Sequence, residues 1–341
     1  MRRVLLATIK IILILCSFSA CSKDESWSTP EKVYISVVFT PEGFCNMAYN
    51  DSILKAIEAL SQKYGYEYSF SIPETIEDGM AYYNTWYNTE LSDNTRCLFI
   101  FASNIYEEYL RDAPHLLDDP LRDVLIFEVE KELSYAYTFA MTYYGASYMI
   151  GSYYLNYHPI DFQIIAANPY LGGLNYVVDG LTLATEEMAL GSVNVTHLSD
   201  SPSGGLDDAS YAYIMCKNAD YLIKDNYDIF VPYAGLSNLG IYRFSESNHQ
   251  ITVGVDCIDP DLYSYTYLCM NKHMDLALDN FFSLWIRGQE PPKYIFYTLE
   301  SGVVSVDAAK LLEEDRPRLD SYLKQAIDKE KTYFREREAN E

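Results

Sequence analysis

The chain has 341 residues, of which 49 are acidic and 25 are basic, and its formal net charge is −24. Nucleic acid repels a protein this acidic, which excludes nucleic-acid binding and favours a ligand without negative charge. The length exceeds the usual range of a single hydrophobic core, so we expect two lobes.

The N-terminal residues read as an export signal. Arg2 and Arg3 precede the apolar run VLLATIKIILILCSF, which is too short and wrongly flanked for a permanent membrane helix. The run ends in SFSAC, which resembles a bacterial lipobox, where the signal is cut before a cysteine that then carries lipid. We expect a lipoprotein signal peptide at 1–20 and a tether at 21–31 that starts at the lipidated Cys21. The protein is then anchored in the bacterial cell envelope, on the periplasmic face or the outer surface; an ordinary signal peptide is the alternative.

Strands and helices alternate along the first part of the exported chain. Runs of β-branched and aromatic residues predict strands at 32–39, 66–72, 95–102 and 123–129. Apolar residues at helical spacing predict helices at 48–65, 75–91 and 104–113. This alternation favours a parallel sheet with both faces covered.

The alternation starts again after about residue 142. Strands are predicted at 161–170, 192–198, 228–234 and 251–256, and helices at 145–158, 174–190, 207–226 and 267–289. Residues 293–307 read as a hairpin or paired strands, and the charged tail as a helix broken near Pro317.

The sequence therefore predicts an α/β fold with two doubly wound parallel-sheet lobes joined by a hinge. We expect the first lobe at 32–141 plus about 262–290, and the second at 142–261. Residues 291–341 form the C-terminal strands and helix.

The sequence contains no pattern typical of catalysis or metal binding. Its five histidines are isolated, no G-x-S-x-G elbow is present, and the five cysteines left after Cys16 and Cys21 lack C-x-x-C spacing. We expect no enzyme activity, no cofactor and no metal.

The ends of the predicted strands are richer in chemistry. They run into SNIYEEY, LGG and GLSNLG, and one strand ends on Asp256. Glycines at such ends let backbone N–H groups approach a ligand closely, and ligands of doubly wound sheets bind beyond the carboxyl ends of the strands. Simple turn geometry is the preferred explanation for any single glycine, but several such strand ends on one rim lead us to expect a cleft between the lobes.

The resemblance to a known family then becomes specific. The segments GFCNMAYNDSILKAIEAL, TFAMTYYGASYMIGSYYL, LGGLNYVVDGL, YDIFVPYAGLSNLGIY, ITVGVD and CMNKHMDLALDNFFSLWIRG follow the order and spacing of the basic membrane protein family of substrate-binding lipoproteins. That family includes the purine nucleoside receptor and has the two-lobed fold of type I periplasmic binding proteins. The resemblance covers about residues 32–305.

The resemblance implies a set of ligand-facing residues, which are Asn46, Gly172, Gly173, Gly235, Gly240, Asp256 and Lys272. Asp256 matches an aspartate that binds ribose hydroxyls in nucleoside-binding members, and Lys272 matches a lysine on the helix that follows it. An ionised carboxylate accepts hydroxyl hydrogen bonds, and a nearby ammonium supports its charge. The chain departs from the family pattern at Glu42, which is shifted, and at Glu128, where aspartate is common.

A flat base would also need an aromatic partner, which contributes about 1–3 kcal/mol per stacked base. Among the 33 tyrosines and 15 phenylalanines, Tyr106 is the first choice, followed by Phe44 and Tyr233. The sequence thus predicts a lipid-anchored solute-binding protein for a nucleoside-like molecule, with an ABC permease or an outer-membrane transporter as partner. A sugar-binding protein and a ligand-free surface interaction lipoprotein of the same fold are the alternatives.

Overall fold

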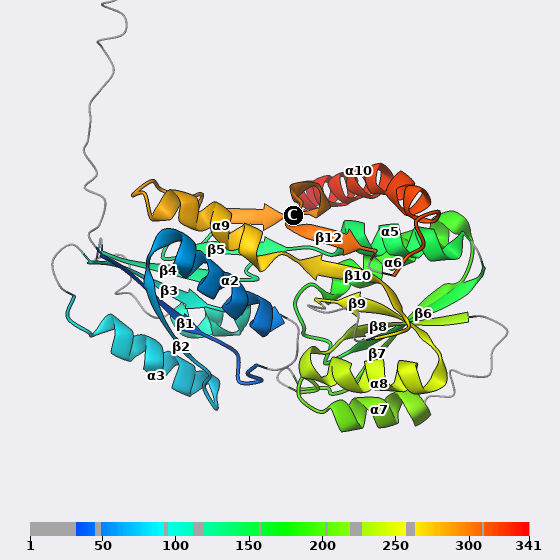
Figure 1. Cartoon of the computed structure of the whole chain (residues 1–341), viewed down its shortest axis with the longest axis horizontal. Coiled ribbons are helices and arrows are strands. Elements are labelled where there is room, and N and C mark those ends of the chain that lie inside the picture. The colour runs from blue at the N-terminus through cyan, green and yellow to red at the C-terminus, as the bar shows by residue number, and fades with distance from the viewer. Residues whose placement is uncertain are drawn as a thin grey trace, which may run out of the picture.

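The computed structural model describes residues 32–44, 49–91, 95–111, 119, 121–156, 158–201, 204–218, 227–256, 263–308 and 310–340. They form two α/β lobes side by side, each with a six-stranded sheet between layers of helices (Figure 1). The predicted signal peptide and tether, with Cys21, and the predicted ligand residue Asn46 lie outside the described residues. Crossing a lipid bilayer would need a longer or more apolar helix than any in the described part of the chain.

The first lobe is built on a fully parallel sheet with the strand order β11-β5-β4-β3-β1-β2. Its strands are β1 (Lys32–Val38), β2 (Glu67–Ser71), β3 (Thr95–Phe101), β4 (Arg122–Phe127), β5 (Tyr137–Met141) and β11 (Tyr294–Tyr297). Helices α2 (Tyr49–Tyr64) and α9 (Met274–Trp285) cover one face of the sheet, and α3 (Ile76–Tyr87) covers the other (Figure 1). Because both faces are covered, β3 and β4 end in unbroken buried apolar runs.

The second lobe repeats this plan with the strand order β12-β10-β9-β8-β6-β7, in which β12 alone runs antiparallel to its neighbour. Its strands are β6 (Ile160–Ala166), β7 (Ser192–His197), β8 (Tyr227–Tyr233), β9 (Ile251–Val255), β10 (Thr266–Lys272) and β12 (Val304–Asp307). Helices α5 (Tyr144–Leu155) and α6 (Leu174–Met188) lie on one face, and α7 (Ala209–Asn218) and α8 (Asn238–Asn248) on the other (Figure 1). All seven residues of β6, which lies between β8 and the edge strand β7, are buried.

The two sheets match strand by strand when they are read from edge to edge. Strand β3 of the first lobe corresponds to β8 of the second, and β4 corresponds to β9. A 3-10 turn follows each member of the first pair, η1 (Asn104–Tyr106) after β3 and η4 (Gly235–Ser237) after β8. The predicted fold class of two doubly wound α/β lobes is confirmed.

Three segments of the chain cross between the lobes, and hydrogen bonds join them side by side. The first leads from β5 to α5, the second from β10 to α9, and the third from β11 to β12. Thr142 N–H donates to the Tyr297 carbonyl at 3.1 Å, and His273 N–H donates to the Val303 carbonyl at 2.8 Å. These three hydrogen-bonded crossings form the hinge.

The C-terminal helix α10 (Arg316–Asn340) runs unbroken along α5 on the outer side of the hinge (Figure 1). The predicted break near Pro317 is wrong, because Pro317 is the second residue of the helix, where its missing N–H has no partner to lose. The ring of Tyr333 stacks on Tyr144 with 4.1 Å between ring centroids.

The single helix predicted for 267–289 is also wrong. Its first part is strand β10, and only Met274–Trp285 is helical. Leu268, Cys269 and Met270 are fully buried because they lie in the interior of the second sheet. The predicted inclusion of 262–290 in the first lobe therefore needs correction for 266–272, which belong to the second sheet.

The predicted pairing within 293–307 is not observed either. Strand β11 pairs with β5 in the first sheet, whereas β12 pairs with β10 in the second, so the chain between them crosses the hinge. Strand β5 was not predicted, although all five of its residues are buried. Its sequence YTFAM is short and has no alternation that would distinguish a strand from the start of the following helix.

Candidate functional site

A cavity of about 220 Å³ lies between the lobes, where the carboxyl ends of strands from both sheets face each other. An engineered protein cavity of about 150 Å³ holds benzene, so this cavity admits a larger molecule. Its polar lining consists of Thr40, Glu42, Tyr49, Asn50, Ser103, Asn104, Glu128, Tyr170, Tyr233, Asn238, Asp256 and Lys272. The position is the one that doubly wound sheets use for ligands.

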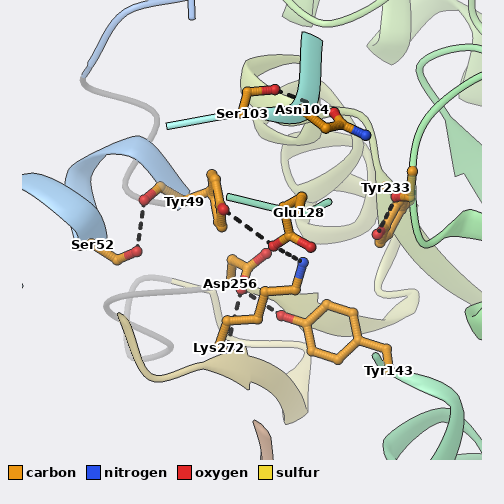
Figure 2. A network of polar contacts seen from close by, with 10 residues as sticks. Tyr49, Ser52, Ser103, Asn104, Glu128, Tyr143, Tyr233, Asp256 and Lys272 are labelled. Carbon is orange, nitrogen blue, oxygen red and sulfur yellow. Dashed lines mark hydrogen bonds and ion pairs between the residues drawn. The ribbon is translucent and has the colours of Figure 1, made fainter. Parts of the chain in front are cut away.

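An ion pair between the two lobes lines this cavity, and Figure 2 shows it with its neighbours. Lys272, the last residue of β10, extends its ammonium to Glu128, directly after β4, with 2.7 Å between Nζ and Oε1. The Tyr49 hydroxyl donates to the same Glu128 oxygen at 3.1 Å. The side chains of Lys272 and Glu128 are only 8% and 20% exposed, so solvent screens their attraction weakly.

The second carboxylate of the cavity, Asp256, follows strand β9 (Figure 2). Its Oδ1 accepts a hydrogen bond from the Tyr143 hydroxyl and another from the Lys272 backbone N–H at 3.2 Å. The Lys272 ammonium also lies over the rings of Tyr49 and Tyr143, at 5.4 and 5.2 Å from their centroids. Two carboxylates, one ammonium and two phenols therefore form one connected group.

The two residues that carry these carboxylates have a left-handed backbone conformation, with φ of +60° at Glu128 and +50° at Asp256. In the described part of the chain, the other non-glycine residues with positive φ are Ala189 and His249, which end helices α6 and α8. Such a conformation costs residues with side chains of the order of 1–3 kcal/mol and gathers at functional sites. Glu128 and Asp256 hold it at matching positions of the two lobes, directly after β4 and β9.

Burial and charge set the protonation of the group. Burial raises the pKa of Asp256, against the opposing effects of the Lys272 charge and the Tyr143 hydrogen bond. Burial alone would lower the pKa of Lys272, but Glu128, Tyr233 and Asp256 together raise it above its ordinary value. Burial and the neighbouring carboxylates raise the pKa of Tyr49 and Tyr143 far enough that both stay protonated donors.

Two acceptor atoms of this group have no hydrogen-bond donor among the described residues. Glu128 Oε1 and Asp256 Oδ1 carry all the hydrogen bonds that these carboxylates receive, which leaves Oε2 and Oδ2 without one. The described lining contains three acids, Glu42, Glu128 and Asp256, and one base, Lys272. The cavity therefore favours a ligand that donates hydrogen bonds and disfavours an anion.

Four of the predicted ligand residues line the cavity, namely Gly172, Gly235, Asp256 and Lys272. Gly172 comes close to the opposite lobe, because a Cβ there would lie 3.2 Å from Nδ2 of Asn104. Gly173 lies next to the cavity with φ of +75°, begins helix α6, and leaves room for the Tyr233 hydroxyl. That hydroxyl donates to the Gly172 carbonyl at 3.1 Å.

Two predicted ligand residues lie elsewhere. Tyr106 is completely buried in the first lobe, where its ring packs on Phe101 and its hydroxyl donates to the Phe39 carbonyl at 2.7 Å. Gly240 lies inside α8, and a Cβ there would come within 1.9 Å of the Ala209 carbonyl oxygen at the start of α7. Gly240 therefore allows two helices to pack closely and does not face the cavity.

The two other aromatic candidates, Tyr233 and Phe44, lie in different surroundings. Tyr233 lines the cavity, whereas Phe44 packs edge-on against Phe39 and Phe70 in the first lobe. Lys272 lies at the end of a strand, and the predicted position on a helix is wrong.

Sequence reasoning missed several residues of the group. Glu128 was noted only as a departure from a family pattern, although its position directly after a buried apolar run was a usable signal. Tyr143 follows the unpredicted strand β5, so nothing in the sequence placed it beside Asp256. Tyr170, on the loop after β6, lines the cavity mouth with 66% of its surface exposed. Among the described residues, no group of three or more His, Cys, Asp or Glu is arranged to hold a metal ion.

Comparison with known proteins finds similar solved structures but no matching family. No model of a known protein family matches the chain, and no curated protein matches it either. A solute-binding protein of an ABC transporter system from Aeropyrum pernix K1 is similar in structure, with a TM-score of 0.66 and 12% sequence identity over 88% of this chain and 86% of that one. A transcriptional activator of the comK gene from Bacillus halodurans gives 0.65 at 15% identity, over 86% and 97%. A periplasmic solute-binding protein of an ABC transporter from Actinobacillus succinogenes 130z, solved with bound D-allose, gives 0.59 at 10% identity, over 81% and 97%.

These likenesses concern the fold. They confirm that the chain has the two-lobed α/β architecture found in solute-binding proteins of ABC transporters. Membership of the basic membrane protein family stays a prediction.

Proposed function

We propose that the protein is a solute-binding protein that captures a small hydroxyl-bearing molecule in the cavity between its lobes. A nucleoside is the ligand class that we propose first. The observation that carries this proposal is the pair of carboxylates Glu128 and Asp256, which stand at matching strand ends of the two lobes and face one cavity. Contacts from both lobes favour a closed state on ligand binding. The similar structures of ABC solute-binding proteins support the same role.

The chemistry of the cavity supports a ligand with neighbouring hydroxyl groups. The free oxygens of Glu128 and Asp256 accept hydrogen bonds, and a ribose offers two adjacent hydroxyls as donors. Tyr49, Tyr170 and Tyr233 add aromatic surface against which a base can stack. The excess of acids repels phosphorylated forms of the same ligand.

A sugar is the second candidate, because the same acceptors suit its hydroxyl groups and one similar structure contains D-allose. The predicted lipid anchor at Cys21 belongs to the proposal, and so does delivery of the ligand to an ABC permease or an outer-membrane transporter. The proposal includes binding of the ligand without its chemical conversion, and therefore no enzyme activity.

A thermal-shift panel on the exported chain from Ser22 tests the proposal. The panel compares inosine, guanosine, D-ribose and D-allose with inosine 5′-monophosphate. We expect a nucleoside to raise the melting temperature and its monophosphate to have little effect. Asp256→Asn keeps the shape of the side chain but removes its charge, and it should weaken binding tenfold to a hundredfold, since hydrogen bonds to charged groups contribute about 1.5–3 kcal/mol.

Asp320→Asn is the matched control, because Asp320 is an exposed acid on α10 that does not line the cavity. It should leave both melting temperature and affinity unchanged. A response to D-allose alone would move the assignment to a sugar. No response to any compound, or release of a free base from inosine, would contradict a binding function.

A further inference from the structure

A buried carboxylate on the C-terminal helix contacts the hinge. Glu330 of α10 is only 1% exposed, and each of its two oxygens accepts one backbone hydrogen bond. Oε1 accepts from the Gly145 N–H at 3.1 Å, and Oε2 accepts from the Leu299 N–H at 2.9 Å. Among the described residues it has no ion-pair partner.

Its two donors belong to different crossings between the lobes. Gly145 is the second residue of α5, just past the crossing from β5, and Leu299 lies on the crossing from β11 to β12. The absence of a side chain at position 145 permits the approach, because a Cβ there would meet the Glu330 carboxylate at 3.1 Å. One carboxylate thus holds two of the three crossings from the outer side of the hinge.

Both of these crossings are connected to residues of the cavity. Tyr143, two residues before Gly145, donates to the cavity residue Asp256. The crossing that contains Leu299 accepts, at the Val303 carbonyl, the N–H of His273, which directly follows the cavity residue Lys272. A change in the angle of the crossings therefore moves the phenol and the ammonium relative to the two carboxylates of the cavity.

We propose that Glu330 is a positioning residue for the interlobe cavity. By holding the Gly145 and Leu299 N–H groups together, its carboxylate fixes the angle at which the lobes face each other. The proposal stands on the two-lobed fold and does not depend on which ligand binds.

The surroundings of Glu330 make this contact sensitive to pH. Burial, together with the nearby charge of Glu300, raises the pKa of Glu330 to about 7, against the two backbone hydrogen bonds that lower it. The neighbouring lysines of α10 point elsewhere, with Lys329 paired to Glu187 and Lys331 to Glu300. From α5, the phenol of Tyr144 is the titratable group that senses its charge.

Protonation weakens the contact, because it converts one acceptor oxygen into an O–H group that faces a backbone donor. As pH falls through about 7, Glu330 becomes protonated and keeps only one of its two backbone hydrogen bonds. The two backbone donors lower the pKa of Glu330, so an open state that loses them while α10 stays packed on α5 has the higher pKa, and protonation favours that open state.

Small-angle X-ray scattering of the ligand-free exported chain tests this from about pH 6 to about pH 8, on either side of the value of about 7. We expect the radius of gyration of the wild type to increase as pH falls through this range. Glu330→Gln, which supplies one acceptor and one donor in place of two acceptors, should show the larger radius at every pH. Glu313→Gln, at a 94% exposed side chain, should follow the wild type.

A second measurement connects the hinge to the cavity. Calorimetric titration with inosine should show about tenfold weaker binding to Glu330→Gln, within the usual range of coupling between sites, and no pH dependence over this interval. Equal radii for wild type and Glu330→Gln at every pH would overturn the positioning role. If Glu330→Gln does not fold, a wild-type radius that is constant with pH overturns it equally well.

The two measurements separate this inference from the proposed function. A pH-dependent radius that Glu330→Gln abolishes, together with no binding of inosine, supports the positioning role and contradicts the nucleoside assignment.

Discussion

Glu128 and Asp256 combine three properties that rarely occur together in one residue: a left-handed backbone, a place at a strand end and a carboxylate that faces a cavity. Strain of this kind persists only where the surrounding structure enforces it. Here the backbone N–H groups of Glu128 and Asp256 donate to the carbonyls of Phe139 and Met270, on the neighbouring strands, and both side chains are also hydrogen-bonded. The two strained residues are therefore both fixed by neighbouring strands and exposed to the cavity.

The ion pair between Lys272 and Glu128 gives a prediction at this scale. Lys272→Met should lower the free energy of unfolding by about 3 kcal/mol, because loss of one partner leaves buried carboxylates without compensation. Glu128→Gln in the same chain should restore part of this loss, since it removes one of the uncompensated charges. Urea unfolding of the two variants measures both effects.

Lys331→Met is the control, because its partner Glu300 is 56% exposed and such surface pairs contribute about 1 kcal/mol or less. An unfolding midpoint of Lys272→Met equal to that of the wild type would contradict a stabilising role for the ion pair.

The sequence could identify some of these residues and not others. Asp256 and Lys272 were accessible because short motifs carry them, ITVGVD and CMNKHMD. Glu128 and Tyr143 depend on which strands become neighbours, and Tyr106 depends on which way a ring turns after a strand. A tyrosine just past a strand end looks the same in sequence whether it faces the cavity or, like Tyr106, donates to a buried carbonyl.

At the scale of elements, the packing of α7 against α8 depends on Gly240. Gly240→Ala should lower the free energy of unfolding by about 1–3 kcal/mol, because the added methyl group meets the backbone of Ala209, which cannot turn aside. The affinity for inosine should stay unchanged, since Gly240 does not line the cavity. Thermal melting and calorimetry measure the two effects.

Arg243→Ala is the matched control on the exposed side of α8 and should cost little stability. Weaker inosine binding by a stable Gly240→Ala variant would return this glycine to the ligand site.

Most elements could be predicted from their periodicity, and the exceptions lie at the hinge. Strands β5 and β10 were not predicted, and β11 and β12 were predicted as strands but with the wrong pairing. All four border the crossings, where short runs change directly into helices or turns. The run TYLCMNK mixes strand-forming Thr and Tyr with helix-forming Leu, Met and Lys, so its own composition does not decide between the two, and its place between β9 and β12 makes it a strand. Long, strongly periodic segments such as α2 and α6 do not depend on such neighbours.

At the scale of the whole molecule, the two lobes have the same strand order, and each receives one edge strand from the C-terminal part of the chain. The first lobe takes β11 and the second takes β12 from the part of the chain that follows both. Helix α10 then links the halves, since Arg337 lies 3.6 Å from Glu130 of the first lobe and Lys329 pairs with Glu187 of the second. The predicted separate C-terminal unit at 291–341 is thus distributed over both lobes.

The proposed anchor is tested on the whole protein. Cys21→Ser removes the thiol that lipid would modify, so the variant should move from the membrane fraction to the soluble envelope fraction of the producing bacteria. Ser22→Ala, next to it, should leave the distribution unchanged. An equal membrane share for wild type and Cys21→Ser would contradict lipidation at this residue.

The late arrival of β11 and β12 has a consequence for biosynthesis. Domains generally fold as units, with the N-terminal one first, while the ribosome is still at work. Here the edge of β5 stays open until Tyr297 has been added, and the edge of β10 until Asp307. Neither lobe can be completed early, because nearly the entire polypeptide must be synthesised before either sheet has its last strand.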